Sequence, residues 1–339
     1  MTKPLVVICS FLVTLILISQ PSWPQDKPDP KVVEAAKKEA EVNWLTITAL
    51  EPNTQIITLF QKRYPFIKPV QSRAGGGPLL NKIITEAQGG RNSWDVVVGR
   101  GEMFPALMGK KLLASYRSPE LKMIDDDLID KAGYWTAYNL QTWVLGYNTN
   151  LVRKEDVPKT YDDLLDPKWM RQKISIDTEG YGWLQGLMGA WGREKTLSYF
   201  KKLAAQDPAL KRGNTLRVQV TAAGEYPLII TLAALIHRLS SKGAPIDWVP
   251  LEPAVVRINP VMLSANAPNP NAAKLFVDFL LSKEAQQILA SLGDIPVRKD
   301  VNPDPPRLIR GYKRVIERPE GYKDLKETVD LYSEIFNLR

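Results

Sequence analysis

Three strand-like runs decide the fold: VNWLTIT at residues 42–48, IKPVQS at residues 67–72 and DVVV at residues 95–98. Helical stretches separate them, one opened by Pro52 and the other spanning residues 78–88 before a Gly-Gly pair. The valines of the last run form a short apolar strand, as a parallel sheet buried on both faces requires. The order β-α-β-α-β therefore predicts an α/β fold that binds ligands at the carboxyl ends of its strands.

The middle of the chain repeats this alternation. Strand-like runs lie at residues 143–148, 173–177, 228–232 and 244–249, with helical stretches between them. The first of these runs could cross from one domain to another. A chain of 339 residues exceeds what one hydrophobic core usually holds, so we expect two domains of similar design.

The first 25 residues are typical of a secretory signal peptide. Lys3 supplies a positive charge, an apolar run covers residues 5–18, and a Pro/Ser-rich stretch follows. The run is shorter than the roughly 20 residues that a spanning helix needs. We expect residues 1–25 to be removed on export. An uncut N-terminal anchor is the alternative, because the small-residue cleavage pattern is poor.

The composition excludes several kinds of chemistry. Cys9 is the only cysteine and lies in the expected signal peptide, which excludes disulfides, thiolate nucleophiles and cysteine-ligated metals from the rest. The only histidine, His237, cannot build a site that needs two imidazoles. The net charge is +8, but the basic residues are spread out, which favours a small anionic solute over nucleic acid. We expect no catalytic group, cofactor or bound metal.

The run NPNAAKLFVDFLLSKEAQ at residues 269–286 resembles the late helix pair of bacterial extracellular solute-binding proteins of the ferric-iron and phosphonate type. Residues 32–44, 146–152, 158–164 and 224–227 agree with the same family in the same order. The resemblance implies a type II periplasmic binding protein fold, with two lobes hinged by crossing strands. Each lobe would be a mainly parallel sheet flanked by helices. It also implies a periplasmic monomer that closes on a solute and delivers it to an ABC permease in the inner membrane.

This resemblance divides the chain into segments. We expect lobe 1 to be discontinuous and to contain residues 26–142 and 254–305, while lobe 2 contains residues 143–253. Residues 306–339 are expected to form C-terminal helices, which the sequence does not assign to either lobe.

Strand ends and the helix N-termini that follow them predict the residues that line the cleft, because free backbone N–H groups and the helix dipole favour anions there. In the first lobe these candidates are Thr46, Thr48, Ser72, Arg73, Gly75, Gly76 and Arg100. In the second lobe and on the expected crossing strand they are Tyr147, Thr178, Gly180, Arg217 and Tyr226.

Arg73 is the strongest of these candidates. It follows a strand and precedes a glycine-rich helix start, and its planar guanidinium suits a carboxylate or phosphate group. Arg73 could instead form a surface salt bridge. Arg100 could likewise form an ion pair with Glu102. Glu179 would repel an anion in the second lobe unless it points away or binds a hydroxyl or cationic group.

Three other functions stay open at this stage. Ferric-binding relatives use a Tyr-Tyr pair where this chain has the aliphatic stretch at residues 230–235, and hard ferric iron needs anionic oxygen ligands. A hydrolase would require a carboxylate pair, for which Asp177 and Glu225 are the only nomination. A sensor that presents its closed form to a membrane receptor would have the same sequence features as an importer subunit.

Overall fold

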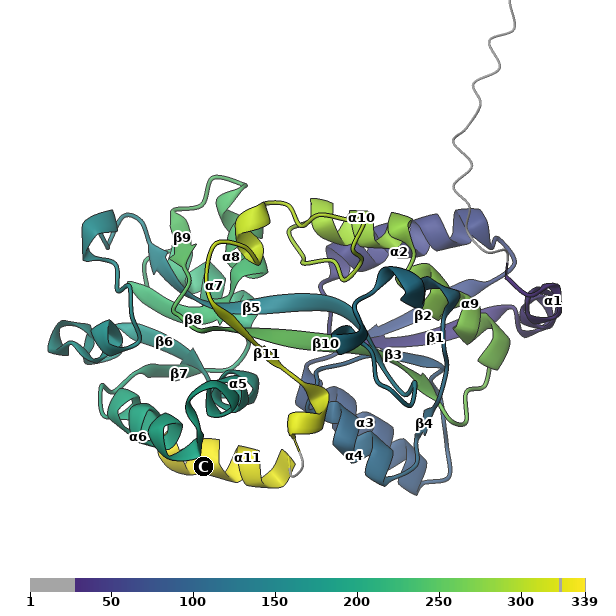
Figure 1. Ribbon diagram of the computed structural model, residues 1–339, viewed down its shortest axis with the longest axis horizontal. Coiled ribbons are helices and arrows are strands. Elements are labelled where there is room, and N and C mark those ends of the chain that lie inside the picture. The colour runs from purple at the N-terminus through teal and green to yellow at the C-terminus, as the bar shows by residue number, and fades with distance from the viewer. Residues whose placement is uncertain (1–27, 323–324, 339) are drawn as a thin grey trace, which may run out of the picture.

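The computed structural model describes residues 28–322 and 325–338, so the expected signal peptide lies outside the described residues. The chain forms two α/β lobes joined by long strands that run through the middle of the molecule (Figure 1). Within the described ranges, no helix combines the length and apolar character needed to cross a membrane.

The first lobe contains the three strands that the sequence predicted. Strand β1 (Glu41–Thr46) lies between β2 (Lys68–Arg73) and β3 (Val96–Val98) and pairs with both in parallel, which confirms the β-α-β-α-β prediction. Helices α2 and α10 cover one face of this sheet, and α3 and α4 cover the other (Figure 1). The remaining elements of this lobe are α1 (Pro30–Glu39), α2 (Leu50–Arg63), α3 (Gly76–Gln88), α4 (Met103–Gly109), β4 (Leu113–Ala114), α9 (Pro270–Leu280) and α10 (Lys283–Ser291).

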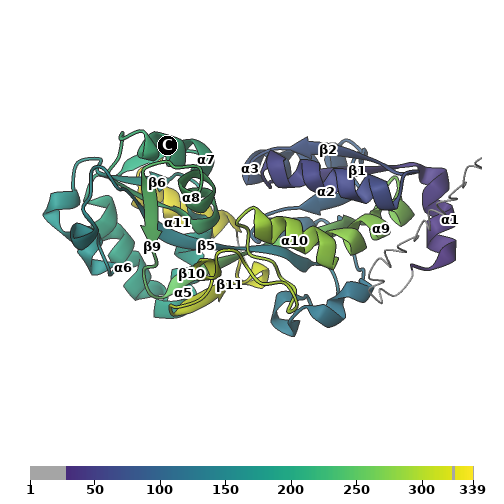
Figure 2. The ribbon, with the colours of Figure 1, turned by 90° about the horizontal axis from the view of Figure 1, so that it is seen from above.

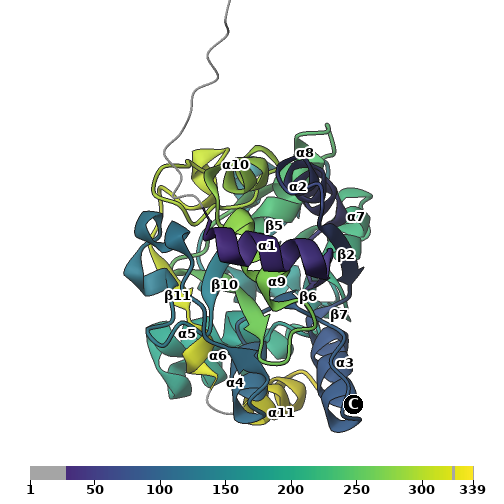
Figure 3. The same cartoon turned by 90° about the vertical axis from the view of Figure 1, so that its right-hand side faces the viewer.

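Helix α1 packs across α9 at the outer end of this lobe (Figure 3). The segment that resembles the solute-binding family therefore forms part of the first lobe, although it lies late in the sequence.

Two long antiparallel strands connect the lobes. Strand β5 (Thr136–Asn148) pairs with β10 (Ala254–Ser264) through the middle of the molecule. The second half of β5 then pairs with β8 and β9 in the second lobe, and the second half of β10 pairs with β3 and β4 in the first. The sequence predicted a crossing strand at residues 143–148, and the strand begins seven residues earlier than that run.

The second lobe has the same kind of sheet. Strand β6 pairs in parallel with β7 and β8, and β8 pairs with the antiparallel crossing strand β5. The bounds are β6 (Ile174–Asp177), α5 (Tyr181–Trp191), α6 (Arg193–Ala204), β7 (Ala209–Lys211), α7 (Asn214–Ala222), β8 (Leu228–Leu232), α8 (Ala233–Ser240) and β9 (Ile246–Val249). Short 3-10 turns lie at Pro119–Met123, Asp126–Leu128, Lys154–Asp156, Asp162–Leu165, Pro167–Trp169, Pro306–Leu308 and Pro319–Gly321.

The segment after Pro306 differs from the expected run of helices. It contains strand β11 (Arg314–Glu317) and one α-helix, α11 (Leu325–Ile335). Strand β11 pairs in parallel with β10, because its β-branched residues Val315 and Ile316 lie beside two valines of that strand. Helix α11 packs against α5 and α6, so the end of the described chain contributes to the second lobe (Figure 1).

Each lobe has an aromatic centre. In the first lobe, the rings of Trp44 and Phe60 lie 5.2 and 4.9 Å from that of Phe276. In the second lobe, the ring centroids of Trp183 and Phe200 are 4.7 Å apart. Figure 2 shows the lobes side by side, with β5 and β10 crossing between them. Trp44 and Trp183 are buried core residues rather than stacking surfaces for a ligand.

Candidate functional site

A cleft of about 370 Å³ lies between the lobes, and both lobes and both crossing strands line it. From the first lobe come Ile47, Thr48, Ala49, Arg73, Ala74, Gly75, Gly76, Arg100 and Asp294. The crossing strands contribute Asn139, Gln141, Arg257 and Asn259. From the second lobe come Gly213, Asn214, Thr215, Leu216, Leu232, Leu235 and Arg238. The volume suits a compact small molecule.

Five of the predicted residues line this cleft: Thr48, Arg73, Gly75, Gly76 and Arg100. Arg73 is the last residue of β2, and the other four follow the carboxyl ends of β1, β2 and β3. Because parallel strands end at the same edge of a sheet, residues far apart in the sequence meet there. The backbone of Gly76 lies close to the side chain of Arg100. Glycine is needed there, since a Cβ at that position would lie 2.8 Å from Cδ of Arg100.

Hydrogen bonds hold the Arg73 side of the cleft in place. Nε of Arg73 donates to the carbonyl oxygen of Thr48 over 2.7 Å. The Thr48 hydroxyl donates to Oδ1 of Asn53 over 2.6 Å and lies 2.6 Å from the hydroxyl of Thr46. Thr46 therefore supports the site from behind and does not line the cleft. Ser72 lies on the exposed edge strand β2 and is likewise absent from the lining.

The second-lobe predictions Thr178 and Gly180 fall outside the cleft. The hydroxyl of Tyr332 donates to the carbonyl oxygen of Asp177 over 2.6 Å and would lie 2.4 Å from a Cβ placed on Gly180. Helix α11 thus occupies the strand end where a ligand was expected. The backbone N–H of Thr178 donates to Lys211 within the lobe.

The other second-lobe candidates are also structural. Arg217 is 1% exposed, and its guanidinium donates to the carbonyl oxygens of Ser175 and Ile230 over 2.6 and 2.8 Å. Tyr147 is buried between β8 and β9, and the hydroxyl of Tyr226 donates to Glu225. None of these three candidates lines the cleft. Arg217 acts indirectly, because its Nη1 donates to Oδ1 of the cleft residue Asn214 over 3.1 Å.

Sequence reasoning missed the floor of the cleft. Asn139 and Gln141 on β5, and Arg257 and Asn259 on β10, lie in strands that are buried along their whole length. Such strands are interpreted as core, so their polar residues were not singled out. The sequence contains one signal for these residues. Polar residues alternate with apolar ones in these strands, and side chains two residues apart in a strand face the same side.

The lining of the cleft contains more positively charged than negatively charged side chains. Four arginines line it, and Asp294 is the single carboxylate among the described residues of the lining. Burial lowers the pKa of Arg257, and the nearby Arg100 lowers it further. Burial also lowers the pKa of Arg100, but the ion pairs with Glu102 and Glu179 outweigh it and hold that pKa above its usual value. The arrangement is chemically suited to an anion.

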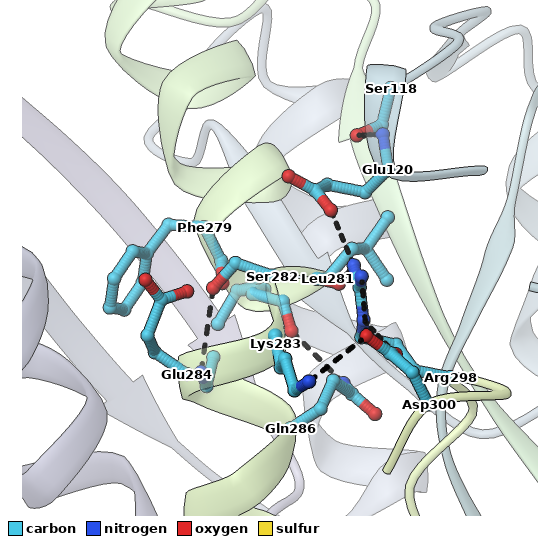
Figure 4. Close-up of polar contacts among 12 residues, drawn as sticks. Ser118, Glu120, Phe279, Leu281, Ser282, Lys283, Glu284, Gln286, Arg298 and Asp300 are labelled. Carbon is cyan, nitrogen blue, oxygen red and sulfur yellow. Dashed lines mark hydrogen bonds and ion pairs between the residues drawn. The ribbon is translucent and has the colours of Figure 1, made fainter. Parts of the chain in front are cut away.

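Asp294 forms an ion pair with Arg238 of the second lobe, while Oδ1 of Asp294 accepts from Nε2 of Gln141 over 2.7 Å. Burial raises the pKa of Asp294, and the Arg238 guanidinium opposes that change. The loop that carries Asp294 is fixed to the first lobe by Arg298, which pairs with Glu120 and donates to Oδ1 of Asp300 over 2.8 Å (Figure 4). The packing of the loop after α10 therefore helps to set the position of Asp294.

The sequence left two alternative chemistries open, a metal site and a carboxylate-dependent hydrolase. No group of three or more His, Cys, Asp or Glu side chains that could hold a metal occurs within residues 28–322 and 325–338. Asp177 and Glu225, the carboxylates nominated for hydrolysis, do not line the cleft. Oδ1 of Asp177 instead accepts from the backbone N–H of Glu179 over 3.0 Å.

Two lobes, two crossing strands and a charged cleft between them define a solute-binding protein. Residues 92–313 match the family of bacterial extracellular solute-binding proteins, and the chain belongs to that family.

One curated relative is Iron uptake protein A1 of Synechocystis sp., which is 27% identical over 192 residues. The match covers 50% of this chain and 53% of that protein, so the chain spans about half the length of this relative.

Two solved structures share the fold. Iron-bound HitA from Pseudomonas aeruginosa has a TM-score of 0.76 at 20% identity, with 87% of this chain and 99% of HitA covered. AfuA from Actinobacillus pleuropneumoniae, with exogenous fructose-6-phosphate bound, has a TM-score of 0.78 at 23% identity, with 88% and 99% covered. These likenesses support the expected type II periplasmic binding protein fold.

Proposed function

We propose that this chain is the periplasmic, ligand-capturing component of an ABC importer, and that it binds a small anionic solute in the inter-lobe cleft. One observation carries the proposal: Arg73, Arg100, Arg238 and Arg257 all line a cleft whose described residues include a single carboxylate. Guanidinium groups in a partly desolvated site bind carboxylate, phosphate and phosphonate through charge-assisted hydrogen bonds.

The N-terminus of α3 adds to this charge. Gly75 and Gly76 begin the helix and line the cleft beside Arg100, and the free N–H groups of a helix start favour a negative group. We infer a binding role without turnover, in which the two lobes close around the solute and the contacts form fully only in the closed state.

A thermal-shift screen of the purified protein tests this proposal. Phosphate, phosphonates and dicarboxylates are compared with neutral sugars at matched concentrations. A ligand at 100 times its dissociation constant adds about 2.7 kcal/mol to the free energy of unfolding. We expect a shift with anions only. A shift with neutral sugars alone, or turnover of a bound anion, would contradict the proposal.

Arg73→Gln sharpens the test, because Arg73 lies at the cleft rim and its side chain is not part of the core. We expect this variant to weaken anion binding by at least tenfold, which corresponds to about 1.4 kcal/mol. Arg91→Gln is the matched control, since Arg91 is exposed in the same lobe and does not line the cleft.

Ferric iron is the second candidate, and the names of the iron uptake relative and of iron-bound HitA favour it. The lining includes neither tyrosine nor histidine among the described residues, and Asp294 would be the only anionic oxygen donor. Ferric citrate and citrate alone are therefore compared in the same screen. Binding of ferric citrate far above citrate would make iron the cargo.

A further inference from the structure

The floor of the cleft is a polar surface built by alternation on the two crossing strands. Asn139 pairs with Asn259 in the ladder, and Gln141 pairs with Arg257. All four side chains line the cleft, while Leu140, which lies between the two on β5, and Val256, which precedes Arg257 on β10, line a separate cavity. Three carboxamides and one guanidinium therefore lie next to one another, facing the site.

Only three of the six polar side-chain atoms of these carboxamides have a hydrogen-bond partner among the described residues. Nδ2 of Asn259 donates to Oδ1 of Asn139 over 2.8 Å, and Nε2 of Gln141 donates to Asp294. The other atoms, Nδ2 of Asn139, Oε1 of Gln141 and Oδ1 of Asn259, have no hydrogen-bond partner among the described residues. The three side chains are between 0% and 7% exposed. A buried polar group without a partner costs about 1–3 kcal/mol, so each of these atoms needs an explanation.

The unpartnered atoms define the kind of group that would satisfy them. Two of the three are acceptors, and ionised carboxylates can only accept hydrogen bonds. A fully ionised carboxylate therefore cannot satisfy Gln141 and Asn259. A hydroxyl group both donates and accepts, so it can satisfy either kind of atom. An ammonium group also donates, but four arginines around the cleft disfavour a positive charge.

We propose that the solute is a hydroxylated anion, either a sugar phosphate or a hydroxycarboxylate. Its anionic group lies against Arg73 and Arg100, and its hydroxyl groups bind the floor formed by Asn139, Gln141 and Asn259. This inference rests on the proposed function and narrows its ligand class. Asp294 fits the same assignment, because a carboxylate that repels an anion accepts a hydrogen bond from a hydroxyl group.

Calorimetric titrations with solutes that differ in hydroxylation test the inference. Citrate is compared with tricarballylate and malate with succinate, and fructose 6-phosphate is compared with inorganic phosphate and with fructose. We expect the hydroxylated anion to bind at least tenfold more tightly in the pair that matches the solute class. The pair in which the hydroxylated anion binds more tightly shows whether the solute is a sugar phosphate or a hydroxycarboxylate.

Equal affinity within every pair would overturn this inference and leave the proposed capture of anions intact. The absence of binding by any anion would instead overturn the proposed function. The two failures are therefore distinguishable in one set of titrations.

Gln141→Met tests the floor directly, because it removes the amide and keeps a side chain of similar length. We expect about a tenfold loss in affinity for the hydroxylated partner and a change below about threefold for its deoxy analogue. The matched control is Gln206→Met. Gln206 is 9% exposed, its Nε2 donates to the carbonyl oxygen of Leu165 over 2.9 Å, and its Oε1 has no partner among the described residues. It lies outside the cleft, so this variant should bind both solutes normally. Equal losses for both solutes in Gln141→Met would contradict the assignment.

Discussion

Arg100 and Glu179 form an ion pair across the cleft, with 3.2 Å between Nη1 of Arg100 and Oε2 of Glu179. Arg100 follows β3 in the first lobe, and Glu179 follows β6 in the second. Their side chains are 14% and 15% exposed, so water screens the pair only partly. Glu179 also pairs with Arg212 over 2.7 Å. A carboxylate of the second lobe thus neutralises part of the charge that a bound anion would use.

Glu179→Gln should therefore strengthen anion binding. The substitution removes a negative charge beside the cleft and leaves Arg100 with one carboxylate partner, Glu102, instead of two. We expect the dissociation constant of a bound anion to fall by about 3- to 10-fold, which corresponds to roughly 1 kcal/mol. Calorimetric titration of the two proteins at the same ionic strength measures the difference.

The matched control for this prediction is Glu155→Gln. Glu155 lies 3.7 Å from Arg153 in an exposed ion pair of the second lobe, so the change in net charge is identical. We expect its effect to stay below about twofold, because solvent screens charges that lie far from the site. Weaker anion binding by Glu179→Gln would show that the ion pair mainly serves to hold the lobes in a binding geometry.

Helix α5 is predicted to tolerate a methyl group at one glycine and not at another. A Cβ on Gly186 would lie 2.3 Å from Cγ1 of Val255 on the crossing strand β10, whereas a Cβ on Gly189 would have no described neighbour within 4 Å. Gly186→Ala should lower the free energy of unfolding by about 1–3 kcal/mol. Gly189→Ala should raise it by about 0.5–1 kcal/mol, because alanine favours the helix. Urea denaturation of the pair measures both, and equal effects would contradict the close contact between α5 and β10.

Arg217→Met should act on stability. The guanidinium of Arg217 joins β6 to β8 through the carbonyl oxygens of Ser175 and Ile230. Removing it leaves buried acceptors without a donor, so we expect the free energy of unfolding to fall by about 2–5 kcal/mol. Chemical denaturation measures this loss. A normal stability combined with lost solute binding would instead restore Arg217 to the binding residues predicted from the sequence.

The first-lobe rim of the cleft could be predicted because it depends on local order. Thr48, Arg73 and Arg100 lie at or just after the end of a strand, and the strands are recognisable from apolar runs separated by helix signals. The geometry of a parallel sheet then brings their positions together without further information.

The second-lobe rim could not be predicted in the same way. The carboxyl end of β6 meets Tyr332 of α11, a residue more than 150 positions later in the chain. Sequence patterns identify helices, but they do not say where the last helix packs. The floor residues Asn139 and Asn259 present a similar difficulty, because they face the cleft only through the pairing of β5 with β10.

A last prediction concerns pH and Asp278 on α9. Burial raises the pKa of Asp278 to about 6, although the hydroxyl of Tyr116 donates to both of its carboxylate oxygens over 2.9 Å. An aspartate in an unfolded chain has a pKa of about 3.9. Since the pKa is higher in the folded state, protonation favours folding. This stabilisation is complete below about pH 4 and is lost as the pH rises through about 6.

Asp278→Asn should remove this dependence, because the amide keeps an acceptor for Tyr116 without a charge. We expect the variant to be more stable than the unmodified protein at pH 7, by on the order of 1–2 kcal/mol, with the difference closing towards pH 4. Urea denaturation at pH 4, 5.5 and 7 measures this trend. Asp126→Asn, at an exposed position of the same lobe, is the control for the loss of one carboxylate. The opposite trend would be a difference in the free energy of unfolding between Asp278→Asn and the unmodified protein that widens at low pH. That result would show that the ionised carboxylate stabilises the first lobe.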